Sequence, residues 1–291
     1  MVELLLQTGV NALYAASYLA LVSVGLVLIF GVMGVINFAH GEVYMLGAYA
    51  VVFAYAEHGL PFLAAVGLAA LFTGLVGLAM ERGLFRPLRD NPLSGLIASI
   101  GLLLMLQALV VTGFGIRMVH VPSAYPGTLP LPGSSGVAVP AQRLLVILAA
   151  VVLLGGLWLF LTRSRLGWAM RACAQDPEAA ALQGISRSGV AQLAIVIGTA
   201  LAGVAGALTA PLVRTFPYMG HSVIVSAFIV IIAGGMGSLE GAILAAVLYA
   251  FVNTFVTTFA DGVTADIVGL LLMLLVLVVR PQGLFGKADR A

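Results

Sequence analysis

Apolar stretches of about twenty residues follow one another along almost the whole chain, separated by short polar or glycine-rich segments. A helix of that length crosses the hydrocarbon core of a bilayer, which is about 30 Å thick. Only 8% of the 291 residues are charged, whereas soluble domains carry about 25%. No alternating pattern typical of a barrel is visible, so the stretches are expected to be helices with internally bonded backbones. The sequence predicts an all-α polytopic bundle of about 8–10 spans, with residues 1–291 as one membrane domain.

The boundaries of the apolar stretches delimit the candidate helices. The candidates are Val10–Phe30, Gly41–Ala56, Pro61–Met80, Leu93–Thr112, Leu144–Thr162, Val190–Leu212, Val223–Ala233, Leu239–Phe259 and Ala265–Val279. Between the fourth and fifth lies a segment rich in proline, glycine and serine, residues 113–142, which we expect to be an irregular external loop.

The basic residues predict how the chain is oriented. Lysine and arginine in short loops stay on the cytoplasmic face. Ten of the 13 basic residues fall in three segments that are separated by even numbers of candidate spans. All three segments can therefore be cytoplasmic, which places the C-terminus inside and the N-terminus outside. The three groups are Arg82, Arg86 and Arg89; Arg163, Arg165, Arg171 and Arg187; and Arg280, Lys287 and Arg290.

Two glycine-rich breaks interrupt the two halves of the chain. When Gly31 is aligned with Gly234, the methionines and glycines that follow also match, and each break precedes an acidic residue. Paired interruptions of this kind indicate a transporter site near the membrane midplane, where broken helices expose backbone dipoles. The alternative is a pair of unrelated packing points. On the transport interpretation, the path or gate includes Gly34, Asn37, His40, Glu42, Gly235, Gly237, Ser238 and Glu240.

The densest polar cluster between apolar stretches contains Asn37, His40 and Glu42. Ionisable groups are costly in lipid, so they face a cavity, pair with one another or lie in the interface. His40 and Glu42 could form such a pair, and Asn37 could bind a polar solute. Alternatively, the cluster is a short cytoplasmic turn in which Asn37 caps the following helix. Groups of histidine and carboxylate with metal-ligand spacing are not found, so no metal site is expected.

The longest polar loop, residues 163–188, encodes a short helix over Pro177–Leu182, bounded by Gly184. Asp176 can cap it, Pro177 suits its first turn, and Glu178 complements the helix dipole. A solvated connector is the simpler alternative. The only lysine, Lys287, is not in a phosphate-binding loop, and no nucleophile elbow is present. Enzymatic activity and nucleotide binding are therefore not expected of this chain.

Four motifs give the chain a specific resemblance. They are Ile36-Asn-Phe-Ala-His-Gly-Glu-Val-Tyr-Met45, Arg171-Ala-Cys-Ala-Gln-Asp176, Gly234-Gly-Met-Gly-Ser238 and Arg280-Pro-Gln-Gly-Leu-Phe-Gly286. In this order, over essentially the whole chain, they resemble the LivH-type permease of branched-chain amino acid ABC importers. Glu178-Ala179-Ala180, followed by Gly184, resembles the EAA loop that docks into an ATPase subunit, although the usual hydrophobic-Leu-Pro ending is absent.

The resemblance implies a set of partners and a mechanism. It implies a LivM-like second permease, two cytoplasmic ATPases that use ATP, and a periplasmic binding protein that delivers the solute, all at a bacterial inner membrane. The chain would contact membrane lipid but no nucleic acid. ATPase motion would pass through Arg171, Asp176, Glu178, Ala179, Ala180 and Gly184. The solute would be a branched-chain amino acid or a related small polar solute. A proton-coupled secondary transporter and a passive solute channel are the alternatives.

Overall fold

The structure, a computed structural model, describes residues 1–89, 91–130 and 138–286. Its described part is a helical bundle with a single two-stranded hairpin. The elements are α1 (Val2–Met33), α2 (His40–Val51) with the π-helical turn η1 (Val52–Glu57), α3 (Phe62–Met80) with the π-helical turn η2 (Glu81–Phe85), α4 (Pro92–Phe114), β1 (Thr128–Pro130), β2 (Ala138–Pro140), α5 (Ala141–Arg163), α6 (Arg165–Gln175), α7 (Pro177–Leu182), α8 (Arg187–Thr209), α9 (Met219–Gly234), α10 (Leu239–Phe259) and α11 (Gly262–Val279).

The polytopic helical fold predicted from the sequence is confirmed. Seven helices in the described residues are long and apolar enough to cross a membrane, and α9 is a shorter apolar helix. Each of the nine candidate stretches corresponds to a helix, with α2 and η1 together covering Gly41–Ala56. The expectation of a wholly irregular segment 113–142 was wrong, because β1 and β2 pair antiparallel within it. Residues 131–137 of that segment lie outside the described residues.

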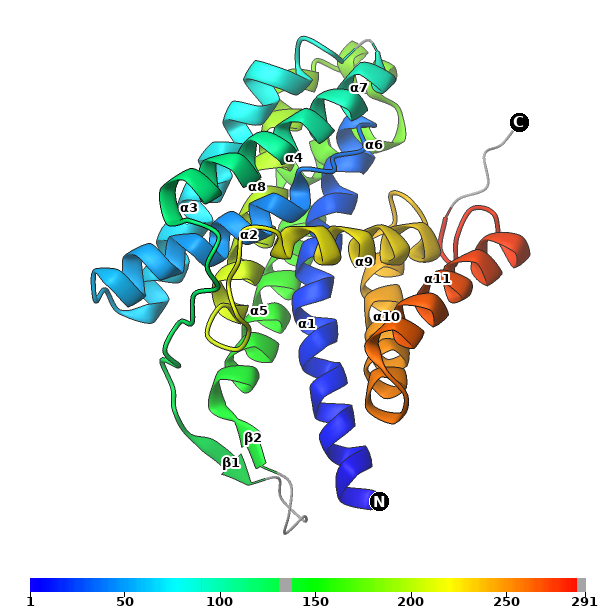
Figure 1. The fold of residues 1–291 in the computed structure, drawn as a ribbon. Helices are drawn as coiled ribbons and strands as arrows, with labels where there is room; N and C mark the ends of the chain where they lie inside the picture. Colours follow the sequence, from blue (N-terminus) through cyan, green and yellow to red (C-terminus); the bar gives the residue numbers. More distant parts are fainter. Residues whose placement is uncertain (90, 131–137, 287–291) are drawn as a thin grey trace.

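The centre of the bundle is the pair α1 and α8, which run in opposite directions (Figure 1). They approach each other closely at two glycines. A Cβ atom added to Gly25 would lie 2.5 Å from the carbonyl oxygen of Gly198, and one added to Gly198 would lie 2.6 Å from that of Gly25. Small residues at such points let two backbones pack closely in a membrane, where no hydrophobic force drives helices together. These glycines therefore fix how the two helices cross.

The helices around this pair form two inverted halves, α1–α4 and α8–α11. In the first half, α3 packs along α8 and α2 contacts α3. The corresponding contacts of the second half are α10 with α1 and α9 with α10. Because α1 and α8 are antiparallel, the halves are related by an axis in the membrane plane, the arrangement of inverted-repeat transporters. Helices α5, α6 and α7 connect the halves and have no counterpart after α11 in the described residues.

One end of the bundle carries the described basic segments. Helices α6 and α7 and the loop after α3 lie at the top of Figure 1, whereas the N-terminus and the hairpin lie at the bottom. The segment after Arg280 joins this end, because Leu284 donates its backbone N–H to the carbonyl of Ala233 over 2.9 Å, close to where α9 ends. Lys287 and Arg290, also assigned to this end, lie outside the described residues.

Candidate translocation site and coupling loop

The predicted polar cluster lies inside the bundle. Gly34, in the left-handed region at φ 68°, closes α1. The chain then returns into the bundle, and α2 begins at His40, whose side chain is fully buried. The His40 Nε2 atom lies 3.1 Å from the carbonyl oxygen of Val22, well inside α1. The cluster does include the turn between two helices that the alternative describes, but its polar side chains Asn37, His40 and Glu42 are buried inside the bundle.

The N-terminal ends of α2 and α9 meet beside the carboxyl group of Glu42. A Cβ atom added to Gly41 would lie 2.4 Å from the carbonyl oxygen of Gly220, and one added to Gly220 would lie 2.4 Å from that of Gly41 and 3.0 Å from Glu42 Cδ. We call this point the α2–α9 crossing. Helix N-termini carry partial positive charge, and broken helices that begin inside a bundle direct this charge toward transported groups. The crossing is therefore the candidate translocation site.

Several polar atoms near the crossing are buried without a hydrogen-bond partner among the described residues. They are both amide atoms of Asn37, His40 Nδ1 and Glu42 Oε2. The other carboxylate oxygen, Glu42 Oε1, accepts a hydrogen bond of 3.0 Å from Gln107 Nε2 of α4. Unused hydrogen-bonding capacity at buried atoms is rare in folded proteins, so each case calls for an explanation beyond packing. Here the unused capacity lies in one short segment at the crossing.

Two proposed roles within this cluster were wrong. His40 and Glu42 do not pair with each other, because His40 contacts the Val22 carbonyl and Glu42 contacts Gln107. Asn37 does not cap α2 with its side chain; Ala39 is the cap residue, and the carbonyl oxygen of Asn37 accepts from the backbone N–H of His40 over 3.3 Å. The physical reason is that residues 34–39 return into the bundle. There the side chains of His40 and Glu42 contact different neighbouring helices.

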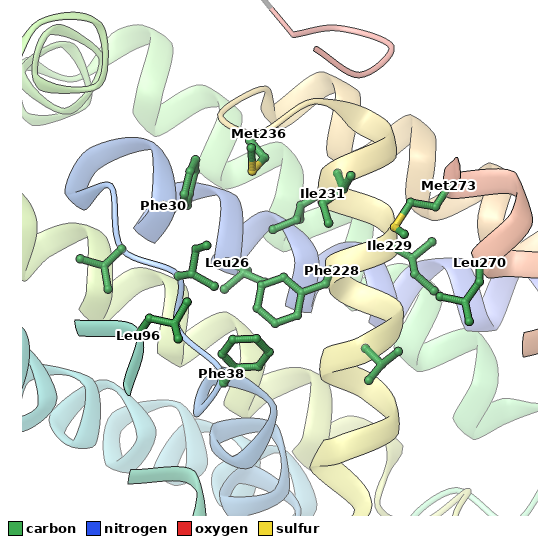
Figure 2. Close-up of a pocket in the computed structure, with 14 residues that line it drawn as sticks. Leu26, Phe30, Phe38, Leu96, Phe228, Ile229, Ile231, Met236, Leu270 and Met273 are labelled. Carbon is green, nitrogen blue, oxygen red and sulfur yellow. The ribbon is translucent and has the colours of Figure 1, made fainter. Parts of the chain in front are cut away.

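An apolar cavity of 340 Å³ lies next to the returning segment (Figure 2). The rings of Phe38 and Phe228 are 4.8 Å apart between centroids and form part of its wall. Figure 2 shows Leu26 and Phe30 of α1 approaching the cavity, with Ile229 of α9 and Leu270 of α11 on another side. Apolar walls around a small cavity suit an aliphatic group.

The second glycine break lies at the end of the bundle, not at the crossing. Gly235 and Gly237 have positive φ angles of 107° and 96°, which turn the chain from α9 into α10. Ser238 caps α10 by accepting the N–H of Gly241 at 3.1 Å, and Glu240 is exposed in its first turn. The two breaks do approach each other, because a Cβ on Gly31 would lie 3.8 Å from Gly237 Cα.

The residues that correspond between the two halves in the structure are not those that the sequence alignment paired. The packing makes Gly41 the counterpart of Gly220, whereas the sequence pattern pairs Gly31 with Gly234. Sequence reasoning also missed Gly220 as a site residue, because no local pattern marks a glycine that contacts a segment far away in the chain. Gln107 of α4 also belongs to the site, because it donates a hydrogen bond to Glu42.

The polar loop 163–188 folds as two short helices, α6 and α7. The predicted helix over 177–182 is confirmed as α7, and Asp176 Oδ1 caps it by accepting the N–H groups of Glu178 and Ala179 at 3.0 and 2.9 Å. Gly184 ends it with φ 79°. Glu178 and Ala179 are exposed, whereas Ala180 is buried. Sequence reasoning missed α6.

The base of this loop lies near the second glycine break, because residues of both line one small hollow. Arg171 of α6 lines a small hollow together with Gly237 and Leu239 at the start of α10 and Val27 and Gly31 of α1. The predicted coupling residue Arg171 and the predicted gate residue Gly237 are therefore brought together. In contrast, Glu178 and Gly184 lie farther along the loop, at positions that have no tertiary hydrogen bond among the described residues.

The inverted halves, broken helices and buried polar crossing define a multi-pass membrane protein of the transport class. The family model described as "Branched-chain amino acid transport system / permease component" matches residues 9–277. The chain belongs to this family, and it is a permease component rather than an enzyme.

Several curated relatives support this assignment along the chain's length. The permease protein BraD of the high-affinity branched-chain amino acid transport system of Pseudomonas aeruginosa is 36% identical, over 98% of this chain and 96% of the relative. The LivH permease protein of Escherichia coli K12 is 33% identical with the same coverage. The LivM permease protein of Salmonella typhimurium is 28% identical, over 91% of this chain and 67% of that relative.

Proposed function

We propose that this permease moves branched-chain amino acids into the cytoplasm as one subunit of an ATP-driven importer. The observation that carries the proposal is the match of nearly the full chain to BraD and LivH, whose names state this transport system. The apolar cavity beside Phe38 and Phe228 supports an aliphatic solute. We place the path along the face that holds this cavity and the α2–α9 crossing.

The proposed partners are a LivM-like second permease, two ATPase subunits and a periplasmic binding protein. The similarity to a LivM protein supports the first of these, because two related permeases can form the two walls of one pore. ATP would be used only by the ATPase subunits. The exposed helix α7 is the proposed docking element, with Glu178 and Gly184 at its two ends.

The hollow shared by α6 and the second glycine break offers a route from this docking element to the pore. A push on α7 would move α6, and Arg171 lines this hollow together with Gly237 and Gly31, at the ends of α10 and α1. Both helices lead toward the interior, and α1 carries the Val22 carbonyl that holds His40. In this scheme α6 and α7 transmit motion and no covalent step occurs on the chain.

The proposed orientation has the α6–α7 end in the bacterial cytoplasm and the N-terminus in the periplasm. The arginines of the described basic segments gather at that end, and such residues remain on the cytoplasmic side of the inner membrane. The hairpin β1–β2 would then face the periplasm, where the binding protein delivers the solute.

The experiment that tests the function is uptake of labelled leucine by proteoliposomes that contain both permeases, both ATPases and the binding protein. We expect uptake only with ATP inside the vesicles. Uptake driven by a proton gradient without ATP would favour a secondary transporter, and energy-independent flux in both directions would favour a channel. Either result would contradict the proposal.

Variants in α7 test the coupling role. We expect Glu178→Lys and Gly184→Glu to leave the permease inserted while uptake is lost and ATP hydrolysis no longer depends on the loaded binding protein. Glu57→Lys, a charge reversal in the exposed η1 turn, is the matched control. Normal uptake in both α7 variants at equal membrane abundance would remove the docking role.

A further inference from the structure

An open crevice separates α3 from α4. Among the described residues, the backbones of these two helices come close to each other at almost no point. A cavity of 560 Å³ lies between them. The size is within the range of about 300–1,000 Å³ typical of small-ligand sites. Small residues leave the gap unfilled, namely Ala79 of α3, Gly83 of η2, and Ala98 and Gly101 of α4.

The equivalent helices of the other half are closed. α10 and α11 pack together, and a Cβ atom on Gly269 of α11 would lie 2.7 Å from Tyr249 Cε2 of α10. The two halves otherwise share their packing, so the crevice is a feature of the α3–α4 pair and not of the fold as a whole. Its other lining residues are apolar: Val76, Met80, Leu84, Leu102, Met105 and Leu106.

Positive charge gathers at the end of this crevice that lies near α6 and α7. Arg82 directly precedes Gly83, which lines the crevice, and Arg86 follows closely; both are exposed. Arg89 is engaged, because its guanidinium donates to Glu81 Oε1 over 3.0 Å, and Glu81 is fully buried. The adjoining Asp90 lies outside the described residues.

The start of α4 adds to this field. Helix α4 has 23 residues and begins at Pro92, with Asn91 as its cap. Asn91 Oδ1 accepts the N–H of Ser94 over 3.3 Å, so the start of α4 contributes mainly its partial positive charge, which favours anionic groups. The apolar crevice reaches Gly83 at the proposed cytoplasmic face, and Arg82 and Arg86 are close to Gly83 in the chain. An apolar crevice with basic residues at its cytoplasmic end is the combination that recognises an anionic phospholipid.

We propose that the α3–α4 crevice is a binding site for an anionic phospholipid of the inner leaflet. One acyl chain lies between Ala79 and Gly101, and the phosphate headgroup contacts Arg82 and Arg86. The bound lipid fills the gap that the small residues leave and joins α4 to the rest of its half. This site is separate from the α2–α9 crossing.

The test is native mass spectrometry of the purified full chain in detergent, titrated with phosphatidylglycerol or phosphatidylcholine. A basic residue near the membrane surface contributes about fivefold to anionic-lipid binding, so we expect phosphatidylglycerol to be preferred by about 25-fold. Arg82→Gln and Arg86→Gln should each lower that preference about fivefold. Arg280→Gln, at the same end of the bundle but directly after α11, should not change it.

A second pair of variants tests the crevice itself. Gly101→Leu should reduce binding of both lipids by closing the gap with the arginines intact. Gly155→Leu of α5 is the control, because a Cβ atom at Gly101 or Gly155 meets nothing within 4 Å, so both side chains can be accommodated. Equal binding of the two lipids, or an unchanged preference in both arginine variants, would overturn the proposal.

The last experiment uses the assembled importer in membranes. Phosphatidylglycerol with a photoreactive acyl chain should cross-link to α3 and α4 of this chain in membranes that contain the whole complex. Cross-links confined to a partner permease would mean that a protein surface covers the crevice, and that result would also overturn the proposal.

Discussion

Gln107 of α4 donates a hydrogen bond from Nε2 to Oε1 of Glu42 over 3.0 Å, and this contact joins α4 to the point where α2 and α9 cross. Glu42 is fully buried, and its second oxygen has no partner among the described residues. Gln107 is therefore the only described side chain that satisfies this carboxyl group. The pair links a weakly packed helix to the candidate translocation site.

We expect Gln107→Leu to destabilise the protein by about 1–3 kcal/mol, because a buried polar group then loses its partner. Glu42→Gln should be close to wild type, since an amide oxygen still accepts from Gln107. Thermal unfolding of the purified chain measures both, with Leu104→Ala on the exposed side of α4 as control. If Gln107→Leu unfolded at the wild-type temperature, the structural role of this bond would be refuted.

The α2–α9 crossing predicts a strict requirement for glycine at two positions. Gly41→Ala and Gly220→Ala should each impair folding, because the added methyl group would lie 2.4 Å from a backbone oxygen of the other helix. Overpacking of this kind costs about 1–3 kcal/mol or more.

The readout is the yield of monodisperse protein after size-exclusion chromatography. Gly67→Ala, on α3, is the control, because an added Cβ there meets nothing within 4 Å. Equal yields for all three variants would show that the two helices do not cross this closely.

An exposed leucine on α7 predicts a contact with a partner. Leu182 has 86% of its surface exposed. The helix is stabilised by its cap residue Asp176, so its formation does not depend on Leu182. Leu182→Ser should therefore leave folding unchanged and weaken co-purification of the proposed ATPase at least severalfold. Leu5→Ser, at the exposed start of α1, is the control. Undiminished co-purification would exclude Leu182 from the interface.

Cys173 offers a chemical probe of the α6 packing. Burial raises the pKa of its thiol, and the nearby Arg187 lowers it by a smaller amount. Because the thiolate is the reactive form, maleimide labelling at neutral pH should be slow in the folded protein and should accelerate as pH rises. In denaturant, Cys173 should be labelled as fast as a free thiol. Rapid labelling of the folded chain would show that α6 is not packed as described.

Orientation is open to a direct measurement. In a Cys173→Ser background, Thr128→Cys in β1 should react with an impermeant maleimide added to intact spheroplasts, whereas Glu240→Cys should react only after lysis. Both positions are exposed. The reverse pattern would invert the proposed topology.

The helices were predictable because span length and capping are local properties. α7 was predicted over 177–182 from its helix-favouring residues, from Asp176, Pro177 and Glu178 at its start, and from Gly184 after its end. The crossing was not predictable, because the contact of Gly41 with Gly220 depends on how the two halves pack and leaves no local signal. The return of residues 34–39 into the bundle was missed for the same reason, and this return separates His40 from Glu42.

The inverted halves have a consequence for how the chain enters the membrane. Turning the molecule over about the axis between α1 and α8 brings each half approximately onto the other, so shape alone cannot decide which face meets the cytoplasm. That decision rests on the arginines, which gather at one end, and on α5–α7, which break the equivalence. A chain that lost this charge bias would keep only α5–α7 to set its orientation, and any copy inserted the other way round would present its proposed docking helix α7 to the wrong compartment.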